Sequence, residues 1–181
     1  LVSMLDKQDN DIYVHIDAKA DFDGSELSTD NAGLYVLDKR IDAAWGDYSL
    51  VEIEFALFEA AYAKGGYEYY HLLSGADIPL VSSEEIHKHC EANPGLEYIG
   101  FSQHLYPDEI KDRTGCHLLF PRHLKSRNIF VRLLRNVAKK TELALFPRNK
   151  NTNIRKGPQW CSVTHNLVVY LLSQKSLVEK T

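Results

Sequence analysis

The stretch SLVEIEFALFEAAYAKGGYEYYHLL, residues 49–73, contains one complete helix-to-strand unit. Its apolar residues recur at the spacing of a helix that buries one face: Ile53, Leu57, Ala60 and Ala61. Ser49 is a residue type that caps helices, Glu52 stands three positions later as in a capping box, and Gly65 interrupts the pattern. The sequence therefore predicts a helix over 49–62, followed by a strand over 69–73.

Short apolar runs on both sides extend this unit into an alternating order of elements. The runs 11–17 and 33–37 predict strands before it, and 98–101 predicts a strand after it. Ser82 and the acidic residues that follow it predict the start of a helix running to about Cys90. Strands alternating with helices are typical of an α/β domain with a mainly parallel sheet, and such sheets bind ligands at the carboxyl ends of their strands.

Charge is distributed unevenly along the chain, although the net charge is only -4. The segment from Arg113 to Lys156 contains twelve basic residues and one acidic residue, which leaves nine basic and twenty-four acidic residues elsewhere. A helix is predicted over 128–146, with a basic loop after it. The C-terminal part predicts a strand over 160–163 and a helix over 164–172, capped by Thr164. We expect one domain over 1–181, with a basic, partly helical insert at 105–155.

Composition excludes several classes of protein. A net charge of -4 gives no general attraction to nucleic acid, and no apolar run approaches the roughly 20 residues that span a bilayer. The three cysteines, Cys90, Cys116 and Cys161, are odd in number and widely spaced. We interpret them as reduced thiols, which favours a cytoplasmic location.

Two candidate binding segments lie at predicted strand and helix ends. Asp17 follows the strand 11–17 and could accept hydrogen bonds from a nucleoside; alternatively, it caps a turn. Trp45 and Gly46 precede the helix at Ser49, where backbone amides and the helix dipole suit a phosphate or a sugar hydroxyl. The alternative is that Trp45 packs against the start of the helix.

Two further candidate binding segments lie next to predicted strands. Ser74, Gly75 and Asp77 come directly after the strand 69–73, where Gly75 permits close backbone approach. Gln159 and Trp160 pair an amide with an aromatic face, a combination that holds sugar rings; alternatively, Trp160 is a core residue on a strand.

Metal binding is not indicated by the spacing of possible ligands. Asp77 has no carboxylate two residues away on either side, whereas magnesium sites usually use one or two carboxylates together with phosphates. His87 and His89 stand two apart on a predicted helix and therefore do not share a face. A Gly-x-Ser-x-Gly nucleophile elbow and Gly-rich phosphate loops are also missing from the sequence.

Four segments in order give the chain a family resemblance: VHIDAK at 14–19, WGDYSLV at 45–51, HLLSGADIPL at 71–80 and KGPQWCSVT at 156–164. The chain resembles the core-2/I-branching glycosyltransferases, whose segments read VHIDxK, WGxxSLV, HLLSGxDxPL and KGSQWFSLT. Pro158 departs from this pattern, because the family prefers serine there.

The resemblance implies a GT-A-type fold, an inverting mechanism and a UDP-sugar donor, usually UDP-N-acetylglucosamine and UDP-xylose in a sister branch. It also implies that Asp17, Trp45, Gly46, Ser49, Ser74, Gly75, Asp77, Gln159 and Trp160 contribute to the donor and substrate site. The family dispenses with a metal, so basic side chains stabilise the leaving diphosphate. Its catalytic glutamate, in a PDE segment, is expected beyond Thr181, and a strand is expected before Leu1. The PDE at 107–109 precedes the tryptophan strand, and we interpret it as a chance match.

Two questions stay open at the level of sequence. One is whether the protein is an active transferase or a carbohydrate- or nucleotide-binding module without catalysis. The other is the role of the helix 128–146, where Phe130, Leu133, Leu134 and Val137 share one face beside basic residues. It could lie on the inner face of an anionic membrane, near a lipid-linked acceptor, or pack on the domain, or bind an acidic acceptor.

Overall fold

A computed structural model of the protein describes residues 1–101, 114–115, 127–145 and 155–179. These residues divide into two compact units, and each is described by itself. The first unit comprises Leu1–Ala43, Tyr48–Ile99 and the described residues from Gln159 onward. The second comprises Ala44–Asp47 and the described residues between Gly100 and Pro158, within which the described part of the basic segment 105–155 falls.

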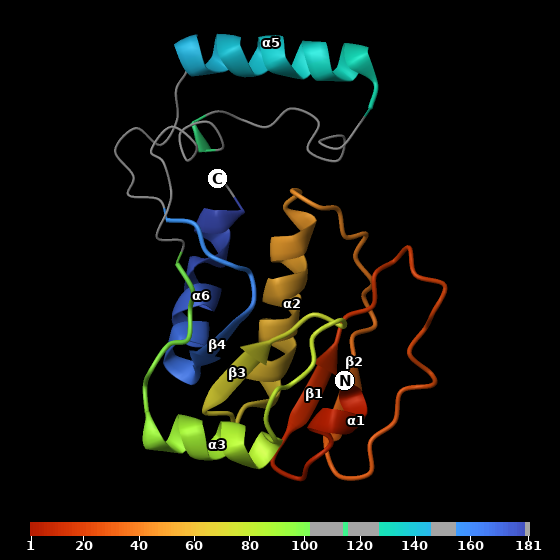
Figure 1. Ribbon diagram of the computed structural model, residues 1–181, viewed down its shortest axis with the longest axis vertical. Coiled ribbons are helices and arrows are strands. Elements are labelled where there is room, and N and C mark those ends of the chain that lie inside the picture. The colour runs from red at the N-terminus through yellow and green to blue at the C-terminus, as the bar shows by residue number, and fades with distance from the viewer. Residues whose placement is uncertain (102–113, 116–126, 146–154, 180–181) are drawn as a thin grey trace. The chain divides into compact units, whose positions relative to one another are not determined.

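Helices and strands are interspersed along the chain (Figure 1). In the first unit they are α1 (Val2–Leu5), β1 (Asp11–Val14), β2 (Gly33–Val36), α2 (Ser49–Lys64), β3 (Tyr69–Leu72), α3 (Ser83–Ala92), β4 (Cys161–Thr164) and α6 (His165–Val178). The second unit contains α5 (Ile129–Leu145). The protein is thus a mixed α/β structure, as the alternating pattern predicts.

The strands form two small sheets, which differs from the mainly parallel sheet expected from the sequence. β1 and β2 are parallel, with Asp11 opposite Gly33 and Val14 opposite Val36. β3 and β4 are antiparallel, with Tyr69 opposite Thr164. Strand direction depends on which distant segment pairs with β3, and local apolar patterning carries no information about that choice. The strand predicted at 98–101 is reduced to one bridge, in which Tyr98 exchanges both backbone hydrogen bonds with Ser162.

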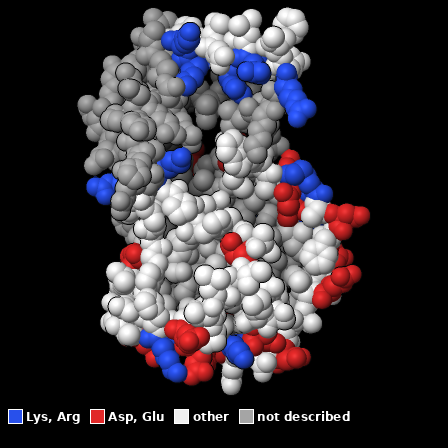
Figure 2. Space-filling model, viewed as in Figure 1, with Lys and Arg blue, Asp and Glu red and all other residues white. Residues whose placement is uncertain are grey.

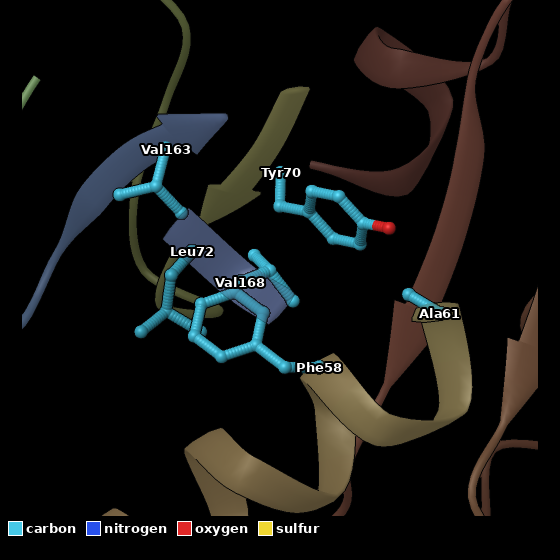
Figure 3. Packing of buried hydrophobic residues seen from close by; sticks show 6 residues of the cluster. All are labelled: Phe58, Ala61, Tyr70, Leu72, Val163 and Val168. Carbon is cyan, nitrogen blue, oxygen red and sulfur yellow. The ribbon is translucent and has the colours of Figure 1, made fainter. Parts of the chain in front are cut away.

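The core of the first unit lies between the β3–β4 sheet and two helices (Figure 3). Its buried members come from α2, β3, β4 and α6: Phe58, Ala61, Tyr70, Leu72, Val163 and Val168. α2 and α6 also pack against each other. The expected buried face of α2 is only partly right. Phe55, Phe58 and Ala61 are buried, whereas Ile53, Leu57 and Ala60 are half-buried, because α2 is apolar around most of its circumference.

The predicted N-terminal caps agree with the structure at two of three helices. Ser82 caps α3 in a complete capping box with Glu85, and the Thr164 hydroxyl accepts a hydrogen bond from the Leu167 amide at the start of α6. The prediction for Ser49 is wrong. Tyr48 occupies the N-cap position of α2 without a side-chain cap, and the Glu52 carboxylate binds Lys39 at 2.8 Å.

Candidate functional site

The carboxyl end of β1 is organised around the carboxylate of Asp17. Its Oδ1 accepts a hydrogen bond from the Lys19 amide at 2.9 Å and lies 3.1 Å from the Lys19 ammonium. The same ammonium contacts Asp42 and the Ala43 carbonyl. The hydrogen bond from the Lys19 amide lowers the pKa of Asp17 below its ordinary value, and the Lys19 charge lowers it further. Asp17 therefore closes a turn, as the simpler interpretation predicts, and is also a half-exposed, ionised acceptor at a strand end.

His15 and Arg40 fix the chain that leaves β2 against this strand end. His15 Nε2 accepts a hydrogen bond from the Ile41 amide at 2.9 Å, and burial is the main cause that lowers the pKa of His15. The imidazole is therefore neutral, with its proton on Nδ1. Arg40 donates to the carbonyls of Asp17 and Ala20, while its buried Nε has no partner among the described residues.

The second strand end is made by β3 and β4 together. Leu72 lies opposite Cys161, so the loop after β3 and the residues before β4 emerge at the same end of the sheet. His71 Nδ1 and Ser162 Oγ are hydrogen-bonded at 2.7 Å across the two strands. The segments 71–80 and 156–164, which are far apart in sequence, are thereby joined through both backbone and side chains.

The loop after β3 is a compact turn built by Ser74 and Asp77. Asp77 Oδ2 accepts from the Ser74 amide at 2.6 Å, and the Asp77 amide donates to the Ser74 carbonyl at 3.1 Å. The Ser74 hydroxyl accepts from the Ala76 amide at 3.2 Å. A Cβ on Gly75 would meet nothing within 4 Å, so the space beside its backbone is open.

Gln159 and Trp160 lie directly before β4, at the same end of the sheet as this turn. Gln159 is half-buried, and the Trp160 residue is 42 % exposed. Trp160 is therefore not the core residue that the alternative interpretation supposed. An exposed indole beside an amide side chain can offer a flat apolar surface and hydrogen bonds to a polar ring.

In the second unit, the chain before Gln159 approaches residue 100 closely. A Cβ on Gly157 would lie 2.1 Å from the Gly100 carbonyl oxygen, so only glycine fits at this position. A Cβ on Gly100 would lie 3.0 Å from the Pro158 ring.

Trp45 and Gly46 also belong to the second unit, and Ser49 belongs to the first. Trp45 is 64 % exposed, which excludes the interpretation that its ring is buried at the start of the helix. Gly46 has a φ of 79°, a left-handed conformation that favours glycine, and the Asp47 amide donates to the Ala44 carbonyl. Ser49 is buried as the first residue of α2.

The structure thus brings together the two predicted segments on β3 and β4: Ser74, Gly75 and Asp77 with Gln159 and Trp160. Asp17 stands at the end of a different strand pair in the same unit. Sequence reasoning did not identify Lys19, Arg40 or Ser162 as parts of these strand ends. Lys19 and Ser162 lie inside two of the four motif segments, whereas Arg40 lies outside all four.

Glu54 on α2 is a further group that sequence reasoning passed over. It is half-buried, and burial raises its pKa to about 7. The pKa of Cys161 is raised to about 11, mainly by burial and further by the charges of Glu54 and Glu97. Cys161 is consequently a neutral thiol at physiological pH, and both described cysteines, Cys90 and Cys161, are free.

A comparison with known families gives a match along the whole of this sequence. The model of the Core-2/I-Branching enzyme family matches residues 1–181. The chain belongs to the Core-2/I-branching enzyme family. No curated protein matches it.

The match confirms the family inferred from the four segments. Core-2/I-branching enzymes are glycosyltransferases. No three metal-ligating side chains gather among the residues that the structure describes. Within the same residues, no helix has the length and apolarity needed to cross a membrane. The PDE at 107–109 and the sites of Cys116, His104, His117 and His123 lie outside the described residues.

Proposed function

We propose that this Core-2/I-branching enzyme is an inverting glycosyltransferase with a GT-A-type donor domain, which transfers N-acetylglucosamine from UDP-N-acetylglucosamine to a glycan hydroxyl. The family supports the reaction class. The observation that carries the site is the pairing of Leu72 with Cys161, because it joins two family segments at one end of a sheet. Xylose transfer from UDP-xylose is the alternative within the family.

In this proposal each strand end serves a different part of the donor. Asp17, ionised and half-exposed, accepts hydrogen bonds from the uridine, since a carboxylate has about four acceptor positions and Lys19 does not use them all. The turn of Ser74, Gly75 and Asp77 in the first unit lines the donor site. Gln159 and Trp160 face the sugars.

The proposed chemistry is a single displacement. An acceptor hydroxyl oxygen bonds to the anomeric carbon while the bond from that carbon to the UDP oxygen breaks, and the diphosphate takes the electron pair. The hydroxyl proton passes to a base, which the resemblance implies is the downstream glutamate. The leaving diphosphate is proposed to be stabilised by basic side chains rather than by a metal.

Calorimetry with UDP and the full-length protein tests the donor site. Asp17→Asn keeps the acceptor for the Lys19 amide but removes the charge, whereas Asp17→Ala removes both. We expect Asp17→Ala to weaken UDP binding by about 1–3 kcal/mol, and Asp17→Asn to have a smaller effect. Asp21→Ala, at an exposed aspartate four residues away, is the matched control. Equal UDP affinity in wild type and Asp17→Ala would show that Asp17 is not part of the donor site.

Release of UDP from the two donors tests the reaction and the sugar. With a glycan acceptor present, UDP-N-acetylglucosamine should be consumed faster than UDP-xylose. Tight UDP binding without turnover of either donor, across a panel of glycan acceptors, would favour a non-catalytic binding module.

A further inference from the structure

Helix α5 exposes the side of its surface that an ordinary helix would bury. Five large apolar residues share that side, at positions i, i+1, i+4, i+5 and i+8: Ile129, Phe130, Leu133, Leu134 and Val137. Their exposed fractions range from 56 % for Val137 to 77 % for Phe130. A helix that packs on its own domain usually turns such a face inward.

The partly covered side of α5 is a different one. Its half-buried residues, Val131, Arg135, Ala138 and Lys139, fall on the side of the helix opposite the apolar row. The apolar row is therefore a separate surface from the half-buried side of the helix.

Basic residues predominate on this helix. Residues 127–145 contain five basic side chains and one acidic residue, Glu142, whereas the chain as a whole carries -4. Arg132 and Lys140 are exposed, and Lys140 lies at the edge of the apolar row, eleven residues after Ile129. Figure 2 shows Lys and Arg gathered along this segment beside uncharged surface. Long basic side chains at such an edge can place their charges in a lipid headgroup layer while the apolar row enters the acyl boundary.

We propose that the apolar row of α5 docks on the surface of an anionic lipid bilayer, with its basic residues in the headgroup layer. Both features are needed for this occupant: the apolar row supplies area to bury, and the positive charge selects an anionic surface. An acidic soluble acceptor would use the charge but leave Phe130 and Leu134 exposed to water. The surface would bring the protein to lipid-linked acceptors, although docking itself does not depend on the proposed transferase activity.

Co-sedimentation of the full-length protein with vesicles tests this docking. We expect binding to vesicles that contain phosphatidylglycerol and weak binding to pure phosphatidylcholine. Binding should decrease at high salt, because screening shortens to about 3 Å at 1 M. The double change Arg132→Gln and Lys140→Gln should weaken binding by about fivefold for each residue. Phe130→Ser with Leu134→Ser should weaken it at both salt concentrations.

Matched variants separate docking from loss of folding. Lys88→Gln on α3 and Leu177→Ser on α6 change exposed residues of the same types and should leave vesicle binding intact. Circular dichroism should show that all variants are folded. Failure of the wild type to bind phosphatidylglycerol vesicles at low salt would overturn the proposal. So would self-association that is abolished by Phe130→Ser and Leu134→Ser while vesicle binding persists, because the face would then be a protein interface.

Discussion

Leu72 and Cys161 lie directly opposite each other in the antiparallel pair of β3 and β4. This register sets the Ser74–Asp77 turn beside Gln159 and Trp160, although about 80 residues of chain separate the two segments. The hydrogen bond between the side chains of His71 and Ser162 stabilises the same register. Predictions about sugar binding therefore concern this end of the sheet.

Trp160→Ala should impair recognition of the sugar more than that of the nucleotide. Removing the indole takes away a flat surface, so we expect the KM for the UDP-sugar or the glycan to rise by about tenfold. UDP affinity, measured by calorimetry, should stay close to that of the wild type. Trp160→Phe should restore much of the loss. If UDP affinity falls in parallel with turnover, Trp160 acts on the nucleotide or on the fold instead.

Removal of divalent metal should leave turnover unchanged. Asp77 hydrogen-bonds to the Ser74 amide within its own turn and has no neighbouring carboxylate in sequence. We expect the initial rate of UDP release to be the same with and without EDTA. Loss of activity on chelation, restored by manganese, would contradict the metal-free diphosphate site.

Glu54 should make stability depend on pH. Burial raises its pKa from 4.5 to about 7, so the folded protein holds more protons than the unfolded chain between these values. The free energy of unfolding should therefore fall as pH rises through this window. Glu54→Gln should be more stable than wild type at pH 8, by about 1–2 kcal/mol, because partial hydration reduces the full cost of the shift.

Urea denaturation at several pH values measures this difference. The advantage of Glu54→Gln should shrink toward zero as pH falls to about 5, where the wild-type carboxyl is also neutral. Glu91→Gln, a change at an exposed residue of α3, is the control for a general charge effect. An advantage of Glu54→Gln that is constant over this range would rule out the buried carboxyl as its cause.

Val168→Ala should destabilise the first unit. Val168 is fully buried on α6 against β3, β4 and α2. Loss of two methyl-sized groups, at about 0.8 kcal/mol each, plus the cavity left behind should lower the free energy of unfolding by about 2 kcal/mol. Val169→Ala makes the same change one residue later, where the side chain is 40 % exposed, and should cost less than about 0.5 kcal/mol. Equal losses in the two variants would contradict this assignment of the core.

Local signals predicted most of the helices and strands. The apolar spacing of α2, the Ser82–Glu85 capping box and the Thr164 cap depend on neighbours within four residues, and such neighbours are visible in the sequence. Ser49 was wrongly predicted as a cap, because Tyr48 occupies the N-cap position; the Glu52 carboxylate binds the distant Lys39. The four motif segments identified the family for the same reason, since residue type and order are properties of the sequence alone.

The sequence by itself determined the elements, the family and the residue types at the candidate site. Only the tertiary structure decided that β3 and β4 are antiparallel, that His71 meets Ser162 and that α5 exposes its apolar row. These features depend on pairings between distant segments, and on which side of a helix is covered. A periodic pattern shows that a helix has an apolar side, but its exposure is set by what the rest of the chain packs against.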